Sequence, residues 1–308
     1  MTQPAPYGRE GGLFRALRSA AAREWDAYCW HPFVQGLAEG TLPLAAFRRY
    51  LVQDYLFLVQ FARAQALAVV KAESLEAMRA KGAVVQAILD ETKIHLVYCR
   101  DWGLDEAAVL AEPEAPETVG YTRWVMDQGF RGDILDLEVA LAPCTVGYGE
   151  VALRIEAHPG RRRDGNPYEN WIVQYASADY QAVARGSAGR LDTLGDTHGG
   201  AARLASLTRV FAEASRLEAD FWQMGLNAAW GSSSRCRAAW TAAWSPGCWP
   251  GRATRSSAPP SSFMTMAPRW GRRAPAAPGR TSTTPATWRT ASAFRTTCWI
   301  ARAGSGRP

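Results

Sequence analysis

The chain has 308 residues, of which 47% are hydrophobic and 21% charged, which is typical of a globular protein and excludes disordered, collagen-like and coiled-coil compositions. Its formal net charge of +6 is unevenly distributed: residues 231–308 hold 12 Arg and no acid, whereas residues 1–230 hold 23 basic and 29 acidic side chains. The acidic first part disfavours nucleic acid as a partner. No run of about 18 apolar residues and no signal peptide occurs, so we expect a cytoplasmic protein without a membrane partner.

The spacing of apolar residues predicts helix nearly throughout residues 8–230, because apolar side chains recur every three or four positions. Thr41 and Pro43 are typical of a helix start, Asp133 of an N-cap and Gly103 of a helix end. We expect helices over Leu44–Ala72, Leu75–Asp101, Asp133–Glu156, Tyr168–Ser177, Asp179–Arg185 and Ala201–Ala228, with a polar loop at 161–166. Since no strand pattern or internal repeat occurs, the sequence predicts an all-α bundle.

Residues 231–308 differ from the rest of the chain, so we expect a helical domain over 1–230 followed by a low-complexity tail over 231–308. The tail contains six Trp and no acid or amide, and its apolar residues follow no helical or strand period. A GC-rich gene translated out of frame gives this kind of composition. A disordered basic segment and a genuine domain are the alternatives, which the other reading frames past codon 230 would distinguish.

Polar groups stand at positions where helical periodicity places apolar faces. Asp54 lies on a stripe of aromatic and aliphatic residues, where burial costs several kcal/mol unless the carboxylate is paired, for example at a helix terminus or with an Arg such as Arg63. Cys144 follows Pro143 within a helical run, and the proline predicts a kink there. Tyr148 shares a face with Cys144, as Trp222 does with Glu218 and Tyr175 with Trp171. In isolation, aromatic residues at this spacing are more often core residues than site residues.

Metal and disulfide chemistry have little support in the sequence. Glu91 and His95, four residues apart, match the spacing of two metal ligands on one helix, but a surface pair or a His bonded to Glu gives the same pattern. The cysteines of the first 230 residues are scattered, and no CxxC, phosphate-binding loop or GxSxG motif occurs.

Several segments together resemble the TenA family, thiaminase II or aminopyrimidine aminohydrolase. They are Trp30-His31-Pro32-Phe33-Val34-Gln35-Gly36-Leu37, Gly40-Thr41-Leu42-Pro43, Tyr50-Leu51-Val52-Gln53-Asp54-Tyr55, Pro143-Cys144 with Tyr148, Trp171-Ile172-Val173-Gln174-Tyr175 and Glu218 with Phe221-Trp222-Gln223-Met224. Their order and spacing fit from about residue 10 to residue 228. Gly149 departs from the pattern, because many members have a second aromatic residue there.

The resemblance implies a heme oxygenase-like helical bundle, usually a homotetramer, that needs no metal or cofactor. It also implies a hydrolase that releases 4-amino-5-hydroxymethyl-2-methylpyrimidine from the aminomethyl pyrimidine or from thiamine, in thiamine salvage. Carried over by motif, the nucleophile is Cys144 and the acid/base carboxylate is Glu218. Asp54 would hold the pyrimidine, and the aromatic positions that enclose the ring fall on Phe57, Tyr121, Tyr148 and Tyr175.

The sequence is also compatible with two other functions. A di-iron oxidase of the same fold would need several convergent Glu, Asp and His side chains, of which Glu91 and His95 are the ones that present themselves. A catalytically silent regulator that binds pyrimidines or a partner protein would not need Cys144 and Glu218, which this chain has.

Overall fold

The computed structural model describes residues 7–231, which contain no strand. The helices follow one another with short connections. They are α1 (Leu13–Ala20), α2 (Ala22–Cys29), α3 (Pro32–Glu39), α4 (Leu44–Lys71), α5 (Leu75–Asp101), α6 (Glu106–Ala111), α7 (Pro116–Arg131), α8 (Ile134–Ala142), the π-helix η1 (Pro143–Gly147), α9 (Tyr148–Glu156), α10 (Glu169–Ala176), α11 (Ala178–Thr197) and α12 (Leu204–Gly231). The all-α prediction is therefore confirmed, whereas the prediction for the tail falls on residues 232–308, outside the described part.

Two predicted helices differ from those observed. The helix expected over Asp133–Glu156 is divided into α8, η1 and α9, since the helix changes its hydrogen-bonding pattern at Pro143. The helix expected over Asp179–Arg185 continues to Thr197 as α11, through Gly186 and Gly189, which lower helix propensity and hide the pattern in the sequence.

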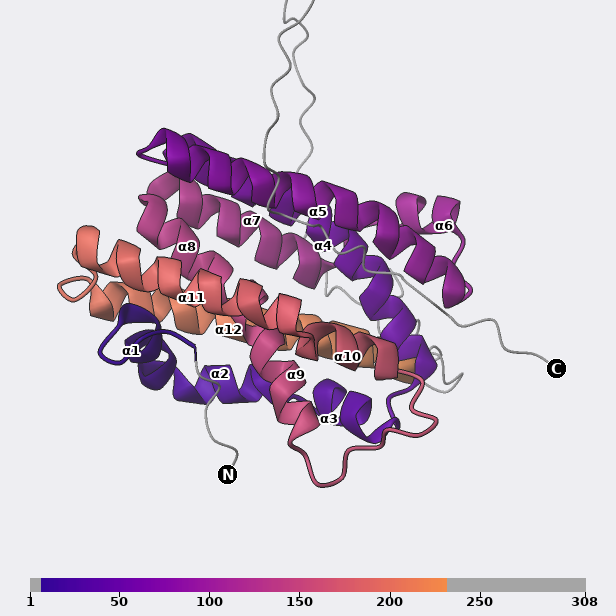
Figure 1. Cartoon of the computed structure of the whole chain (residues 1–308). Helices are drawn as coiled ribbons and strands as arrows, with labels where there is room; N and C mark the ends of the chain where they lie inside the picture. Colours follow the sequence, from indigo (N-terminus) through magenta and orange to yellow (C-terminus); the bar gives the residue numbers. More distant parts are fainter. Residues whose placement is uncertain (1–6, 232–308) are drawn as a thin grey trace, which may run out of the picture. The chain divides into compact units, whose positions relative to one another are not determined.

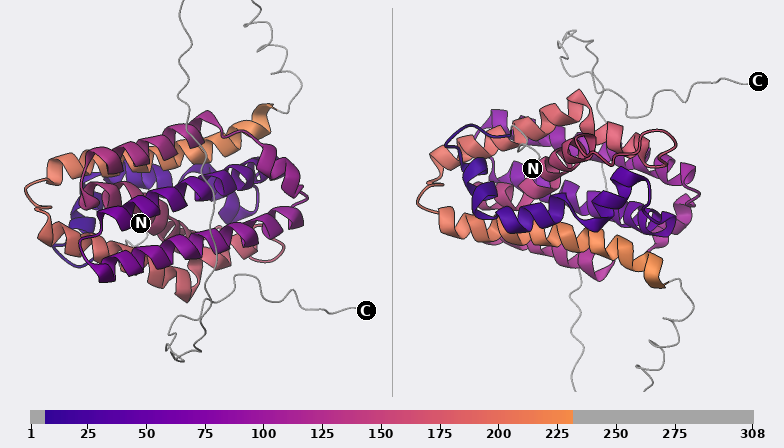
Figure 2. Two further views of the ribbon diagram at one scale, coloured as in Figure 1. Left: turned by 90° about the horizontal axis from the view of Figure 1, so that it is seen from above. Right: turned by 90° about the horizontal axis from the view of Figure 1, so that it is seen from below.

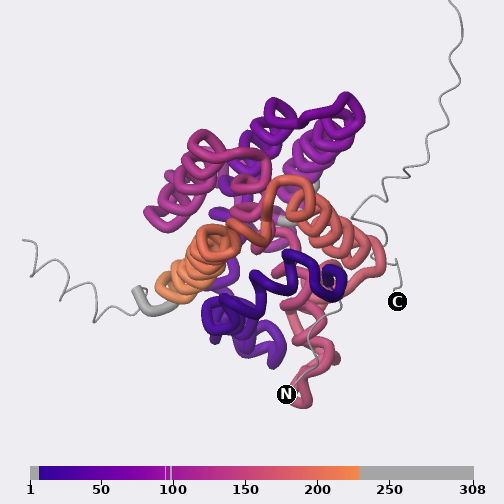
Figure 3. The backbone as a smooth tube through the Cα atoms, turned by 90° about the vertical axis from the view of Figure 1, so that its left-hand side faces the viewer, coloured from indigo at the N-terminus to yellow at the C-terminus, as the bar shows by residue number. Residues whose placement is uncertain are grey.

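The long helices lie side by side in layers (Figures 1 and 2). In Figure 1, α5 and α7 lie along one side, α1 to α3 along the opposite side, and α11 and α12 between them. Helix α4 packs against α5, α7 and α12, and α12 also packs against α2 and α8. Figure 3 shows several helices nearly end on, around a shared interior. Among residues 7–231, none of the helices combines the length and the apolar character that a membrane span requires.

The interior is filled mainly by aromatic rings. Trp222 of α12 stacks on Phe33 of α3, with ring centroids 4.9 Å apart and an interplanar angle of 18°. Trp25 of α2 stacks in the same way on Phe211 of α12, at 5.2 Å and 20°. All four rings are fully buried. Because aromatic rings bury large apolar areas in fixed geometries, these contacts hold α12 against the short N-terminal helices.

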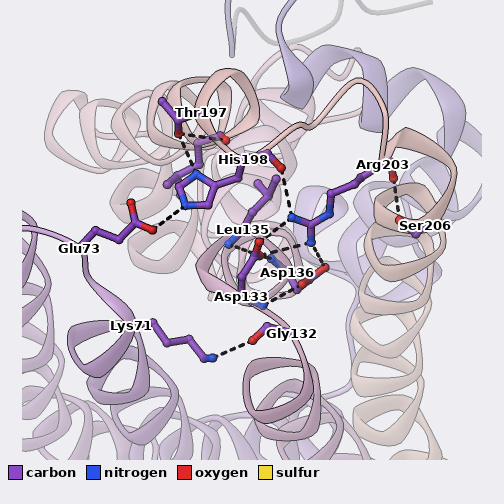
Figure 4. Close-up of polar contacts among 11 residues, drawn as sticks. Lys71, Glu73, Gly132, Asp133, Leu135, Asp136, Thr197, His198, Arg203 and Ser206 are labelled. Atoms are coloured by element: carbon purple, nitrogen blue, oxygen red, sulfur yellow. Dashed lines mark hydrogen bonds and ion pairs between the residues drawn. The ribbon is translucent and has the colours of Figure 1, made fainter.

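The start of α8, which leads directly to η1, is held by a polar cluster (Figure 4). The Asp133 carboxylate accepts hydrogen bonds from the backbone N–H groups of Leu135 and Asp136, and the Asp136 side chain accepts one from the Asp133 N–H. This reciprocal arrangement is a capping box, as the N-cap prediction for Asp133 requires. The Arg203 guanidinium lies 2.6 Å from Asp133 Oδ2 and 2.7 Å from Asp136 Oδ1, which joins this helix start to the segment before α12.

We expect Asp133→Ala to lower the free energy of unfolding by about 1–2 kcal/mol, because it removes the cap and one partner of Arg203. The matched control is Asp127→Ala, which removes an exposed ion pair to Arg131 on α7 and should change stability by less than about 0.5 kcal/mol. Urea denaturation of both variants measures the difference. Equal losses in the two variants would contradict the capping role.

Candidate active site

The candidate site residues come from six elements and meet in the interior. Asp54 and Phe57 lie on α4, Tyr121 on α7, Cys144 in η1, and the other three at the start of α9, on α10 and on α12, namely Tyr148, Tyr175 and Glu218. The ring of Phe57 lies 5.1 Å from that of Tyr121, and the ring of Tyr148 lies 5.1 Å from that of Tyr175. All seven are at least partly buried, and their side chains belong to one hydrogen-bonded and aromatic cluster.

Cys144 lies in the π-helix, whose backbone is held by tyrosines from two other helices. The Tyr28 hydroxyl of α2 donates to the carbonyl of Pro143 at 3.3 Å, and the Tyr180 hydroxyl of α11 donates to the carbonyl of Thr145 at 3.1 Å. These donors satisfy carbonyls on both sides of Cys144. Since π-helical turns are frequent at functional sites, the departure from α-helix singles out this segment.

Gly147, the last residue of η1, is required by the close approach of Tyr28. A Cβ atom at Gly147 would lie 2.2 Å from Cε1 of the Tyr28 ring. We expect Gly147→Ala to destabilise the protein by about 1–3 kcal/mol, because either the ring or η1 must move. Gly189→Ala on α11 is the control, where a Cβ meets nothing within 4 Å and the change should be neutral or stabilising. Thermal unfolding compares them, and equal stability of the two variants would contradict this prediction.

Glu218 is a buried carboxyl group with one hydrogen bond. Its Oε1 accepts from the Tyr121 hydroxyl at 2.8 Å, and the side chain is almost fully buried. Burial raises the pKa of Glu218 to about 8, the Tyr121 hydrogen bond lowers it in part, and the Asp54 carboxylate raises it further. A group with a pKa near neutrality can both accept and donate a proton under physiological conditions.

Asp54 is a second buried carboxyl group, with a different set of partners. Its Oδ2 accepts from the Tyr50 hydroxyl at 3.2 Å, and this hydroxyl in turn accepts from the indole N–H of Trp171 at 3.3 Å. Burial raises the pKa of Asp54 to about 7, against the effect of the Tyr50 hydrogen bond. The alternative in which Asp54 pairs with Arg63 is wrong, because Arg63 is exposed and donates to Gln60 instead.

Glu91 and His95 of α5 are two further titratable residues near Asp54. His95 Nε2 lies 2.9 Å from the carbonyl oxygen of Leu51, and its Nδ1 lies 3.9 Å from Asp54 Oδ2. Glu91 is partly buried, and burial followed by repulsion from Asp54 raises its pKa to about 7. The surface-pair interpretation of these two residues is therefore wrong. Among residues 7–231, no three His, Cys, Asp or Glu side chains are grouped so that they could hold a metal ion.

The Cys144 thiol is neutral in this environment. Burial raises its pKa well above the usual value, and the carboxylates of Glu218, Asp54 and Glu91 raise it further, in that order. Cys144 as a nucleophile would therefore need a base at the moment of reaction, since the thiolate is the reactive form. Glu218 is the acidic group with the largest electrostatic effect on the thiol, and its own raised pKa suits it to accept the proton.

A small pocket of about 10 Å³, room for about one water molecule, lies beside Cys144. It lies between α4, α7 and the junction of α8 with η1, and its wall consists of aromatic, aliphatic and two polar side chains: Phe57, Gln60, Phe61, Ala64, Tyr121, Thr122, Val125, Leu141 and Cys144. Three predicted site residues, Phe57, Tyr121 and Cys144, line it. The other four predicted residues are not among those that line it.

Several residues that support the site could not be assigned to it from the sequence. Tyr50 lies one helical turn before Asp54 on the same stripe, and this spacing was a usable signal for its hydrogen bond. Trp171, which donates to the Tyr50 hydroxyl, lies in the segment from Trp171 to Tyr175 that resembles the TenA family. Gln60 and Thr122 gave no signal, because polar residues on helices are common.

The space next to Gly149 is filled by Tyr7 of the N-terminal segment. A Cβ atom there would lie 2.6 Å from the Tyr7 hydroxyl oxygen. That hydroxyl donates to Gln181 Oε1 at 2.5 Å, and Gln181 Nε2 donates to the carbonyls of Gly149 and Tyr175. Tyr7 thus fills the space that a larger residue at 149 would take, and it connects to the backbone of a predicted site residue.

The comparison with known families gives a match over residues 18–228 to the family described as TENA/THI-4/PQQC. The chain belongs to this family. A protein of Haemophilus influenzae named only as uncharacterized is 40% identical over 217 residues, which cover 70% of this chain and 100% of that protein. An aminopyrimidine aminohydrolase of Halalkalibacterium halodurans is 34% identical over 214 residues, which cover 69% of this chain and 94% of the enzyme. The TenA resemblance is confirmed.

Solved structures agree with the family assignment. A crystal structure described as a TenA family transcription regulator from Silicibacter sp. TM1040 is 42% identical, with a TM-score of 0.66, and covers 72% of this chain and 98% of its own. A domain from Shewanella denitrificans with a heme oxygenase-like fold is 17% identical, with a TM-score of 0.56, over 71% of this chain and 94% of its own. The prediction of an all-α, heme oxygenase-like bundle is therefore confirmed.

Proposed function

We propose that this TenA family member is a hydrolase that uses no cofactor and releases 4-amino-5-hydroxymethyl-2-methylpyrimidine from the aminomethyl pyrimidine, from thiamine, or from both. The observation that carries the proposal is the placement of the Cys144 thiol with Phe57 and Tyr121 at one small pocket, near the buried Glu218 carboxyl, whose pKa is raised to about 8. Three relatives that are 34%, 32% and 28% identical to this chain are named aminopyrimidine aminohydrolases, which supports the same substrate class.

The first step would form a covalent adduct between Cys144 and the pyrimidine. Asp54, with a pKa raised to about 7, donates a proton or a hydrogen bond to a ring nitrogen and makes the ring more electrophilic. Glu218 accepts the thiol proton, and the sulfur adds to the ring carbon next to the one that bears the methylene group. The phenol and phenyl rings of the site stack on the substrate and exclude bulk water.

The second step would break the bond to the leaving group. In the aminomethyl pyrimidine, the π electrons displaced into the ring by the attack of sulfur expel the amine from the methylene carbon, an exocyclic double bond forms, and Glu218 gives its proton to the departing nitrogen. The thiazolium of thiamine leaves as the neutral thiazole, so in that case Glu218 passes its proton to solvent. Water then adds to the methylene carbon after losing a proton to Glu218. The sulfur leaves with the electrons of its bond to the ring and recovers a proton from Glu218, and the ring nitrogen returns its proton to Asp54, which restores the aromatic ring and the starting thiol.

The experiment that tests this function incubates the full chain with the aminomethyl pyrimidine and, separately, with thiamine. Hydroxymethyl pyrimidine is followed by chromatography against heat-denatured protein, and calorimetry measures binding of the product. Catalytic formation of the product supports the hydrolase. Tight binding without turnover would instead favour a silent pyrimidine-binding regulator, an alternative that one relative's description as a transcription regulator keeps in view. Neither binding nor turnover would reject both.

We further propose that the protein acts in the cytoplasm as a homotetramer, as the family resemblance leads us to expect. Val70 on α4 and Phe130 on α7 support an interface between subunits, because their side chains are 79% and 68% exposed. The two helix ends are close, since Lys71 Nζ donates to the Gly132 carbonyl at 2.7 Å. Sedimentation equilibrium measures the oligomeric state, and a monomer would reject this part of the proposal.

A further inference from the structure

We propose that His95 of α5 is a positioning residue for the proposed reaction, because it faces Asp54 with an unprotonated ring nitrogen and so keeps a proton on that carboxyl group. This inference rests on the proposed function, in which Asp54 must carry a proton to polarise the pyrimidine. It gives a role to His95, which stands four residues after Glu91 and takes no part in the proposed steps.

The imidazole of His95 is held by one turn of α4. Its Nε2 lies 2.9 Å from the carbonyl oxygen of Leu51, and its ring lies 6.3 Å from that of Tyr55, at an interplanar angle of 35°. Leu51 and Asp54 are three residues apart, so they lie on the same side of α4. The contact with Leu51 leaves the other ring nitrogen, Nδ1, facing Asp54, at 3.9 Å from Oδ2.

The Leu51 carbonyl determines which nitrogen carries the proton of the neutral imidazole. A carbonyl oxygen can only accept a hydrogen bond, so Nε2 must donate, and Nδ1 keeps its lone pair. Burial lowers the pKa of His95, against the effects of the Leu51 carbonyl and of Glu91, so the ring is neutral near pH 7. His95 thus offers Asp54 an acceptor and no donor.

An acceptor at this position favours the neutral form of Asp54. A carboxylate would place its negative charge against the Nδ1 lone pair, whereas a carboxyl group can turn its O–H toward it. The Tyr50 hydroxyl, which donates to Oδ2 at 3.2 Å, lowers the pKa of Asp54, so His95 and Tyr50 act in opposite directions. Since 3.9 Å is too long for a full hydrogen bond, the proton stays available to a bound pyrimidine.

Other titratable groups also act on Asp54, and they come from several sides of the site. They are Glu91 and Cys99 on α5, Cys144 in η1, Tyr148 on α9, Tyr175 on α10 and Glu218 on α12. Burial raises the pKa of each thiol and phenol in this set, so these four groups are uncharged near pH 7. The two glutamates repel ionised Asp54 where they are themselves ionised, and they therefore act in the same direction as His95.

The pH profile of His95→Asn tests this role, because a purely structural residue would change activity equally at every pH. The asparagine amide can offer an N–H group to ionised Asp54, which the imidazole does not. We therefore expect the alkaline limb of kcat/KM to move to lower pH by about one pH unit. Relative to the unchanged protein, kcat/KM should be about 10-fold lower above pH 8 and less than about 3-fold lower at pH 6.

His198→Asn is the matched control for this profile. His198 contacts Glu73 and Thr197, which are not site residues, so its replacement should leave both limbs in place. Circular dichroism confirms that each variant is folded. An alkaline limb of folded His95→Asn that stays in place or moves to higher pH would overturn the inference.

A second measurement needs no turnover. Nitrogen NMR of the full chain with ¹⁵N-labelled histidine reports the protonation of each ring, and the four histidines of the chain are assigned from their single Asn variants. We expect His95 to be neutral, with its proton on Nε2, from pH 7 to pH 8. A doubly protonated ring, or a proton on Nδ1, would overturn the inference. If the unchanged protein turns over neither substrate, the proposed function fails, whereas the NMR result still decides whether His95 presents an unprotonated nitrogen to Asp54.

Discussion

Replacing Cys144 by alanine is expected to lower kcat for hydroxymethyl pyrimidine formation by at least about 10³-fold, with little change in stability. The expected loss is large because no other thiol among residues 7–231 lines the pocket, and Cys29 and Cys99 are fully buried. Cys144 is only partly buried, so the alanine leaves a small cavity. Steady-state kinetics with chromatographic detection of the product measures the effect.

Cys99→Ala is the matched control for this prediction. It removes a thiol from α5 that is as free as Cys144 but does not line the pocket, and it should retain full kcat. Cys144→Ser adds a second comparison, since a hydroxyl is a far weaker nucleophile than a thiolate and should recover little of the activity. Activity of Cys144→Ala within about 10-fold of the unchanged protein would exclude the covalent mechanism.

The helical part of the fold could be predicted because its signals are local. The ends of α4 and α5 follow from Thr41, Pro43 and Gly103, and Gly103 has the positive φ of 72° that a helix end requires. The α8 N-terminus follows in the same way from the side chain of Asp133. In each case the residue that decides the structure acts on its own backbone or on that of its near neighbours.

The conformation around Cys144 could be anticipated only in part. Pro143 predicts a local disturbance, but the choice of a π-helix depends on hydrogen bonds from Tyr28 and Tyr180, which are far away in sequence. The partners of Asp54 show the same limit. Its inward position follows from helical periodicity, whereas the contact with His95 depends on how α5 packs against α4.

The pocket could not be predicted from the sequence. It forms where side chains of α4, α7 and the α8–η1 junction leave a gap when these elements pack together. Ala64 and Val125 are ordinary core residues by sequence, and what distinguishes them is that each faces the space beside Cys144. Motif resemblance predicted residues of the proposed chemistry, but it gave no information about the space between their side chains.

The pH dependence of kcat/KM is expected to be bell-shaped, with a maximum near about pH 7.5. Glu218 must be ionised to take the proton of Cys144, so activity falls as the pH decreases below its pKa of about 8. Asp54 must carry a proton to polarise the ring, so activity also falls as the pH increases above its pKa of about 7. Because the two carboxyl groups interact, the two limbs belong to the pair.

Glu218→Gln and Asp54→Asn separate the two limbs of this profile. Glu218→Gln should lower kcat about 10²- to 10⁴-fold and remove the acidic limb, while the amide oxygen can still accept the Tyr121 hydrogen bond. Asp54→Asn should remove the alkaline limb and lower kcat/KM. Measurements of kcat/KM across pH for both substrates test this. A profile of Glu218→Gln that keeps the acidic limb of the unchanged protein would reject Glu218 as the base.

The stability of Glu218→Gln shows whether lost activity reflects chemistry or unfolding. The pKa of Glu218 is raised in the folded protein from 4.5 to about 8, so the folded state binds more protons than the unfolded state between these values. The free energy of unfolding therefore decreases as the pH rises from 4.5 to about 8, by at most about 5 kcal/mol from this group. Glutamine removes that penalty, so the variant should be inactive yet more stable than the unchanged protein at the alkaline end of this range. Thermal unfolding at both ends of the range measures the difference, and a variant that is less stable at the alkaline end would show that Glu218 is not held as a neutral acid.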